Sequence, residues 1–579
     1  MVTATTRIQV ESAPGRSGYV PLLCAGFALA CGALYRLVVF ASFSNDQSMH
    51  LAWAQQIVRG ELPGRDFVEP GMPLTIALSA AAQGLMGNWL LAELVLCVTF
   101  IAAAAGLTCW LGVRLTGSPF LGVTAAALQV AIYPRLYNYP KLFVPLVAVL
   151  LIWRYIERPT VARSAVVGVW VATGFLFRHD YVLYLGVAAL AAMAAVLPRC
   201  GRRETAVHLG ACAAAAIMFV LPYLIALQFL GGVAAHFRDG VEFARAEQYQ
   251  WSAALPRFAL APQSSGPSRA DLGPAGPVRR MARAAVLDGV LRAAPVVSRH
   301  NSDVVLYYGA FMLPAALIGA LGIAALRRHP RAWQAHEAQA LALAVLSLAL
   351  ALGFIRHPFQ ARLPDVAGTM PLIAVVIAAA MRHRGGRLRL GAAVLLGVAL
   401  LAVVVEGNVW NRLYATGVIS APRTAVSRVE TQWAALHTWP WERFWPQGPL
   451  APSVRYLHQC TAPDDRILVT WFAPEIFTFA DRGFAAGHAF FTRTHFVSPD
   501  YQAAMLERLS RQRVPVALIN LEQRSWFSTR FSGIDAYLNE VYAVAGTYRN
   551  YDGADIAVAV RRDLKPSGVF VPTGWPCFR

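Results

Sequence analysis

Long apolar runs alternate with short polar connections through the first 406 residues. Several runs reach the roughly 18 residues that a helix needs to cross a hydrocarbon core about 30 Å thick. They predict about eleven membrane spans, at residues 20–42, 88–113, 118–133, 141–156, 164–177, 180–197, 205–229, 302–325, 337–355, 364–381 and 388–406. No small-residue cleavage site clearly follows the first run, so we expect a retained span rather than a signal peptide.

The pattern changes after residue 406. Residues 407–449 are predicted to be a linker, and residues 450–579 a folded domain. Strand composition occurs at 467–470, 514–520, 541–548 and 556–560, and helical spacing at 500–512 and 534–540. The predicted fold is an α-helical polytopic membrane protein, with a transmembrane domain at 20–406 and a small C-terminal α/β domain.

Composition and charge support a membrane protein and give its orientation. The chain is 57% hydrophobic and only 14% charged, whereas soluble proteins carry roughly 25% charge. Positive residues gather in alternate connections, namely Arg114, Arg154, Arg158, Arg163, Arg199, Arg202, Arg203, Arg327, Arg328, Arg331, Arg382, Arg384 and Arg387. Such connections face the cytoplasm. The net charge of +19 therefore reflects topology and does not indicate nucleic-acid binding.

This orientation places residues 1–19 in the cytoplasm and the larger loops outside it. The outer side then holds the first outer loop (43–87), the long loop (230–301), and everything after residue 406. Within the long loop, 233–251 and 278–294 are candidate surface helices. We expect the protein in the inner or plasma membrane, with its functional face and its α/β domain extracytoplasmic.

The first outer loop begins with a predicted amphipathic helix. Met49, Trp53 and Ile57 recur every four residues, so one face is apolar and could lie on the membrane surface. Ser44 and Gln47 have the spacing of a capping box at the helix start. Asp46 falls in the first turn. The helix dipole favours an acid at this position, which explains Asp46 without a function; a functional role is the alternative.

Several short motifs in this loop resemble those of one enzyme superfamily. They are Asn45-Asp46-Gln47, the Ala-containing helix 52–60, the stretch 62–67, Glu69-Pro70 with Pro73, and the following helix 74–87. With the layout of spans and outer domain, they resemble the GT-C membrane glycosyltransferases, which include protein O-mannosyltransferases and aminoarabinose lipid A transferases. The resemblance implies transfer of a hexosyl or pentosyl group from a polyprenyl-phosphate sugar to a glycan, lipid or protein acceptor.

One residue departs from the family pattern. Gln47 stands where many relatives have a second acid, and an amide brings an oxygen without a charge. This weakens the case for a metal held by an acidic pair, so no metal ligand is assigned and a divalent metal stays open. Asp46 is then the predicted general base, which takes the proton of the acceptor hydroxyl during a single, inverting displacement.

Ionisable groups near membrane depth are costly, so those that occur there are candidates for a function. Cations at the outer face are therefore the predicted site for the donor phosphate. Arg178-His179 and Arg356-His357 lie in outer turns against the positive-inside rule and resemble turns of the family. Secondary candidates are Asp66, Glu69, Asp180, Arg362 and Lys141. For Lys141 and Arg135 the simpler interpretation is an anchor that reaches the lipid headgroups.

The cysteines leave the question of a disulfide open. Of eight cysteines, Cys460 and Cys577 lie in the C-terminal domain; a disulfide is plausible there in an oxidising compartment, and two unpaired thiols are the alternative.

Two other function classes are alternatives to the glycosyltransferase. A transporter or flippase of a lipid-linked glycan would share the apolar spans, but it usually has internal repeats and a mid-bilayer site. A non-enzymatic envelope assembly protein is the third class.

Overall fold

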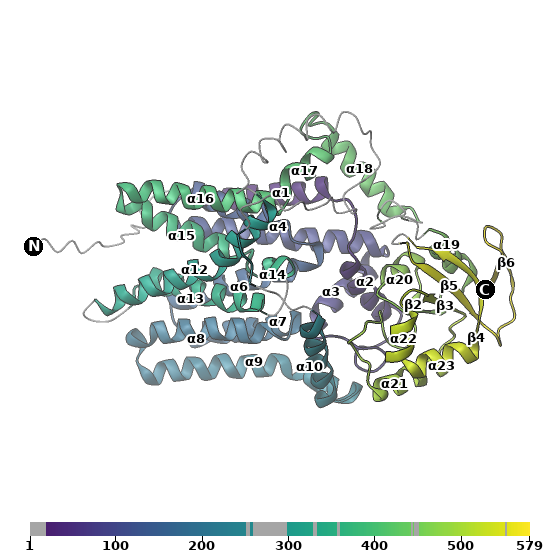
Figure 1. The fold of residues 1–579 in the computed structure, drawn as a ribbon. Coiled ribbons are helices and arrows are strands. Elements are labelled where there is room, and N and C mark those ends of the chain that lie inside the picture. Colours follow the sequence, from purple (N-terminus) through teal and green to yellow (C-terminus); the bar gives the residue numbers. More distant parts are fainter. Residues whose placement is uncertain are drawn as a thin grey trace, which may run out of the picture.

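The computed structural model describes residues 19–250, 255–258, 298–327, 333–355, 359–439, 441, 444, 451–550 and 553–579. Its helices form an elongated bundle, and the C-terminal α/β domain covers one end of that bundle (Figure 1). The first outer loop, with helices α2 (Asn45–Val58) and α3 (Pro73–Met86), lies where the bundle meets the domain.

Eight of the described helices are long and apolar enough to cross a membrane. They are α1 (Tyr19–Val39), α4 (Trp89–Thr116), α6 (Tyr139–Glu157), α8 (Tyr181–Cys200), α9 (Arg202–Leu230), α12 (Arg299–Leu326), α13 (Ala335–Ala351, which a 3₁₀ turn extends to Ile355) and α16 (Arg387–Glu406). Their number supports a multi-pass membrane protein.

The other three expected spans correspond to shorter helices. These are α5 (Pro119–Ala131), α7 (Val161–Phe177) and α15 (Thr369–Arg384), with 13, 17 and 16 residues. At a rise of about 1.5 Å per residue, 13 helical residues cover only about 20 Å. The count of eleven crossings therefore stays a prediction.

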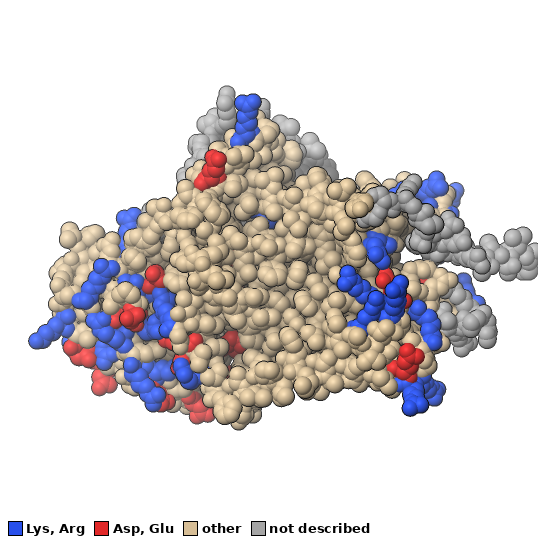
Figure 2. Space-filling view, turned by 180° about the vertical axis from the view of Figure 1, so that it is seen from behind, with Lys and Arg blue, Asp and Glu red and all other residues tan. Residues whose placement is uncertain are grey.

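The surface of the bundle fits a lipid environment. Large apolar side chains are exposed on α9, among them Ile217 at 65% and Phe229 at 86%. Charged side chains gather over the C-terminal domain and at the opposite end of the bundle, and the broad belt between them is almost free of charge (Figure 2). Apolar patches of this extent on a protein surface mark contact with a membrane or a partner.

Helix α2 begins where the sequence predicts but is buried. The backbone N–H of Gln47 donates to Ser44 Oγ at 3.3 Å, which confirms Ser44 as the N-cap, whereas the Gln47 side chain donates to Glu93. The prediction of a helix on the membrane surface is wrong, because Trp53 and Gln56 are buried and α2 packs between α3 and α20 (Glu475–Ala480). The four-residue repeat in the sequence predicts only the apolar face of α2 and not what covers the other face. Its polar face is covered by a distant part of the chain, where Gln56 Nε2 donates to the Phe484 carbonyl at 3.1 Å.

The C-terminal domain has the predicted α/β fold. Its strands are β1 (Arg466–Val469), β2 (Gly483–Phe484), β3 (Val516–Asn520), β4 (Tyr542–Arg549) and β5 (Asp555–Arg561), in the order β2-β1-β3-β5-β4. Strands β2, β1 and β3 are parallel, and β5 is antiparallel to β3 and β4. The helices are α19 (Ala451–Cys460), α20, α21 (Pro499–Arg511), α22 (Arg524–Arg530) and α23 (Ser532–Val541), and β6 (Gly568–Phe570) pairs with β7 (Trp575–Cys577). A disulfide joins Cys460 to Cys577.

The remaining elements connect these parts. They are η1 (Leu136–Asn138), α10 (Val233–Gln250), η3 (Leu352–Ile355), α14 (Phe359–Val366), α17 (Val409–Ala415) and α18 (Thr424–His437). Helix α10 matches the surface helix expected at 233–251, whereas the one expected at 278–294 lies outside the described residues. The segment expected to be a linker at 407–449 contains α17 and α18.

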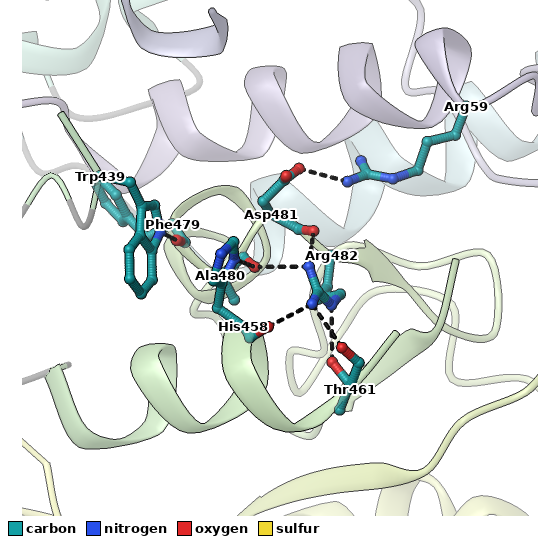
Figure 3. A network of polar contacts seen from close by, with 8 residues as sticks. All are labelled: Arg59, Trp439, His458, Thr461, Phe479, Ala480, Asp481 and Arg482. Atoms are coloured by element: carbon teal, nitrogen blue, oxygen red, sulfur yellow. Dashed lines mark hydrogen bonds and ion pairs between the residues drawn. The ribbon is translucent and has the colours of Figure 1, made fainter. Parts of the chain in front are cut away.

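A polar network fixes the domain to the first outer loop (Figure 3). Arg59 at the end of α2 pairs with Asp481 at 2.7 Å. The adjacent Arg482 is buried and donates to the carbonyl oxygens of Asp481 at 2.7 Å, His458 at 2.6 Å and Thr461 at 2.7 Å. Buried guanidinium and carbonyl groups thus satisfy each other, which such groups require inside a protein.

We expect Arg482→Met to destabilise the domain strongly. The substitution leaves several buried carbonyl oxygens without a donor, at about 1–3 kcal/mol for each. The free energy of unfolding should fall by roughly 3–5 kcal/mol, the range for breaking a buried charged network. Thermal unfolding of the purified protein in detergent measures the change.

The matched control is Arg511→Met, which removes an exposed pair with Glu507. Exposed pairs contribute about 0–1 kcal/mol. Equal losses for the two variants would contradict an anchoring role for Arg482.

Candidate functional site

The Asp46 carboxylate is held by two side chains from another part of the chain. Arg135 Nη1 and Tyr137 Oη each donate to Asp46 Oδ2 at 2.8 Å. Neither bond uses Oδ1, and the Asp46 side chain is 36% exposed. The carboxylate is therefore oriented through one oxygen while it keeps access to the surroundings.

Both partners come from the connection between α5 and α6, where the short helix η1 presents Tyr137 to the start of α2. Arg135, interpreted from the sequence as a headgroup anchor, instead pairs with Asp46. The Tyr137 ring stacks on His50, with centroids 5.3 Å apart. Sequence reasoning passed over Tyr137, since aromatic residues are common at membrane boundaries for reasons unrelated to catalysis.

His50 is buried one turn after Asp46. Burial lowers its pKa to about 4, although the Asp46 charge acts in the opposite direction. The imidazole is therefore neutral at neutral pH. Lys141 also lowers the pKa of His50, which places Lys141 and Asp46 within electrostatic reach of the same ring.

Gln47 points into the bundle. Its Nε2 donates to Glu93 Oε1, and Ser79 Oγ donates to the other oxygen of the same carboxylate. Gln47 thereby ties α2 to α4. Among the described residues, no group of three or more His, Cys, Asp or Glu side chains is placed to hold a metal ion.

A second cluster surrounds Asp365, a residue that the sequence analysis did not single out. Arg178 Nη1 lies 2.8 Å from its Oδ1, and Lys141 and Arg362 each approach the carboxylate to 3.6 Å. Arg178 Nη2 also pairs with Asp180 Oδ2 at 2.5 Å. We call these five residues the cation cluster, because three cations face two carboxylates.

The cation cluster brings together four residues that the sequence analysis nominated. Lys141 is buried there, so a headgroup anchor does not describe it. Arg356 and His357 lie outside the described residues. Asp365 could not be found from sequence spacing, because it meets Arg178 across 187 positions of the chain.

His179 lies next to Arg178 in sequence but faces another group of residues. Its ring stacks on Phe175 at 4.4 Å, and its Nε2 lies 3.3 Å from Tyr223 Oη, which in turn is 3.1 Å from His236 Nε2. Burial, and then the nearby His236, lower the His179 pKa to about 4. A neutral imidazole offers no ionic attraction to a phosphate, unlike the cation expected from the sequence.

Glu69 belongs to the same group. It is 2% exposed, its Oε1 accepts from the Met72 amide, and its Oε2 lies 3.9 Å from His236 Nε2. Burial raises its pKa to about 7. The loop after Glu69 packs tightly on His179: Gly71 has φ +96°, and a Cβ there would lie 2.8 Å from His179 Nδ1.

Glu69 lines a cavity of about 290 Å³ between the first outer loop, the α9–α10 junction and α21. Asp66, the remaining candidate in this loop, has a local role. It accepts from the Leu62 amide at 2.8 Å and pairs with Arg65 at 2.6 Å, so it closes the turn before Glu69.

Several solved structures resemble the chain, and two of them are forms of one protein. The crystal structure of ArnT from Cupriavidus metallidurans bound to undecaprenyl phosphate matches with a TM-score of 0.47 and 10% identity, over 94% of this chain and 99% of that chain. The apo form matches with a TM-score of 0.42 and 11% identity, over 93% and 97%.

A likeness of this degree assigns neither an activity nor a residue to this chain. No family model matches the chain, and no curated protein matches it.

We expect Glu69→Gln to change the pH dependence of stability. The folded pKa of about 7 lies above the ordinary 4.5. The folded protein therefore keeps a proton that the unfolded chain releases, and stability falls as pH rises from about 4.5 to about 7, by roughly 3 kcal/mol in total. Glutamine does not titrate. The unfolding temperature of Glu69→Gln relative to wild type should be higher at pH 8 than at pH 5.

Glu507→Gln is the control, because it makes the same substitution at an exposed carboxylate. A Glu69→Gln difference that does not change with pH would show that the Glu69 carboxyl titrates normally.

Proposed function

We propose that this protein is a membrane glycosyltransferase that moves a sugar from a polyprenyl-phosphate donor to an acceptor hydroxyl on the extracytoplasmic face. The observation that carries the proposal is the Asp46 carboxylate oriented by Arg135 and Tyr137, together with the cation cluster around Asp365. The donor class and the outer face follow from the motif resemblance and from the charge pattern of the connections.

In the proposed reaction, Asp46 acts as the general base. Arg135 and Tyr137 hold Oδ2, and Oδ1 takes the proton of the acceptor hydroxyl. The hydroxyl oxygen forms a bond to the anomeric carbon while the bond from that carbon to the phosphate oxygen breaks. The electron pair leaves with the polyprenyl phosphate. A single displacement of this kind inverts the anomeric centre.

The cation cluster is suited to the leaving phosphate. Three cations face two carboxylates, so positive charge remains to stabilise the anion in a poorly hydrated site. The Arg178 guanidinium donates to Asp180 and Asp365 and carries a charge that attracts the phosphate. Arg356 and His357 are proposed to join from the neighbouring turn.

We expect Asp46→Asn to abolish transfer. The amide keeps the size of the side chain but cannot accept the proton, so the rate should fall by about 10²–10⁴-fold, the usual contribution of general base catalysis. The assay uses purified protein and radiolabelled polyprenyl-phosphate sugars. Binding of the donor lipid should be unchanged.

Asp464→Asn, at an exposed position of the C-terminal domain, controls for the loss of one charge. Wild-type transfer by Asp46→Asn would remove Asp46 as the base. Absence of transfer by the wild type, with lipid translocation in vesicles instead, would favour a flippase.

We expect Arg178→Gln to weaken donor binding. Loss of a charge-assisted hydrogen bond costs about 1.5–3 kcal/mol, or roughly 10–100-fold in the donor KM. Arg178→Lys keeps the charge that balances Asp180 and Asp365, so it should recover part of the affinity. The exposed Arg114→Gln at the other end of the bundle is the control. An unchanged donor KM in a folded Arg178→Gln protein would exclude a phosphate contact.

A further inference from the structure

We propose that the cavity beside Glu69 is a binding site for an uncharged saccharide ring, separate from the Asp46 carboxylate. The inference extends the proposed function, since a sugar transferase must hold sugar rings. Its test is a binding measurement that does not require transfer.

The cavity is built by three distant segments. Its walls come from residues 64–69 of the first outer loop, residues 227–242 of the α9–α10 junction, and residues 498–508 of α21. Its volume of about 290 Å³ is near the lower end of the roughly 300–1,000 Å³ typical of small-molecule sites. This size fits a small polar molecule better than a polyprenyl chain.

The charges of the lining disfavour an anion. Apart from the buried Glu69, three acidic residues line the cavity against two arginines, namely Asp239, Glu242 and Asp500 against Arg238 and Arg508. An ionised carboxylate only accepts hydrogen bonds. A ligand with several hydroxyl donors and no negative charge therefore suits this wall, whereas a phosphate or a uronic acid does not.

Other lining groups add hydrogen-bonding atoms and apolar surface for a sugar ring. Tyr501 Oη donates to Asp239 Oδ1 at 2.5 Å, which fixes both side chains. Phe67 and Leu227 contribute apolar surface for the C–H groups of a ring. The buried Glu69 supplies a carboxyl that holds a proton near neutral pH, so it can donate or accept.

The cavity adjoins the cation cluster through the turn between α7 and α8. Arg178 enters the cluster, whereas the next residue, His179, contacts Gly71 and Tyr223 on the cavity side. A phosphate at Arg178 and a ring in the cavity could therefore belong to one donor molecule, or the ring could belong to the acceptor. Both sources share the same chemistry of neutral hydroxyl groups.

The experiment is thermal unfolding of the full-length protein in nanodiscs with single sugars. The neutral probes are glucose, galactose, mannose, arabinose and N-acetylglucosamine, and the anionic probes are glucose 6-phosphate and galacturonate. A ligand that binds only the folded state raises the unfolding temperature, at about 50 mM for a site of millimolar affinity. We expect at least one neutral sugar, and neither anionic one, to do so.

Adjacent residues of α21 supply matched variants. Ala504 lines the cavity, and Ala504→Trp should fill it and remove the shift. Ala503 is exposed on the same helix, so Ala503→Trp should keep the shift. No shift with any neutral sugar, an equal shift with the anionic sugars, or a shift that survives Ala504→Trp would overturn the proposal.

Two further arms separate this inference from the proposed function. Asp46→Asn should still bind the free sugar although it does not transfer, and loss of binding in that variant would contradict a separate site. A wild-type protein that binds sugar but transfers none would refute the transferase and leave the cavity site standing. Saturation with donor lipid that abolishes sugar binding assigns the cavity to the donor's ring, and binding that persists assigns it to the acceptor's ring.

Discussion

The burial of α2 between the helix bundle and the C-terminal domain is the constraint on which the candidate site depends. Gln47 ties the start of α2 to Glu93 of α4, and Arg59 ties its end to Asp481. Asp46 lies at the first end of this segment, and Glu69 follows shortly after the second. Because polar contacts fix both ends, the carboxylate of Asp46 and the cavity beside Glu69 keep a defined separation.

The sequence was informative where the signal is local. The Ser44 cap and strands β1, β3, β4 and β5 follow from short-range patterns, whereas the short strands β2, β6 and β7 were not predicted. A charge rule singled out Arg178, which the fold brings to Asp365. The sequence did not identify Asp365, Tyr137 or His236, because each of them contacts residues that lie elsewhere along the chain. The amphipathic pattern of α2 misled for the same reason: only the fold brings a second surface onto its polar face.

Three neighbouring groups of residues differ in charge in a way that suits the proposed chemistry. The charge of Asp46 is balanced by its ion pair with Arg135, and the cation cluster has one more cation than carboxylates. The cavity lining has more acidic than basic residues. Burial keeps His50 and His179 uncharged between them, with pKa values of about 4. Because these two imidazoles are neutral, they add no charge to that of the cations that attract the leaving phosphate. A protonated His50 would instead compete for the Asp46 carboxylate.

The C-terminal domain takes part in the site as well as covering it. Helix α21 supplies Tyr501 and Arg508 to the cavity wall, and the Val68 amide donates to the Gly487 carbonyl at 3.1 Å. Gly487 has φ +74°, and a Cβ there would lie 2.7 Å from the Asp66 carbonyl oxygen, so the loop and the domain meet at a contact that only glycine permits. The domain therefore helps to shape the loop that carries Glu69 and the cavity that Glu69 lines.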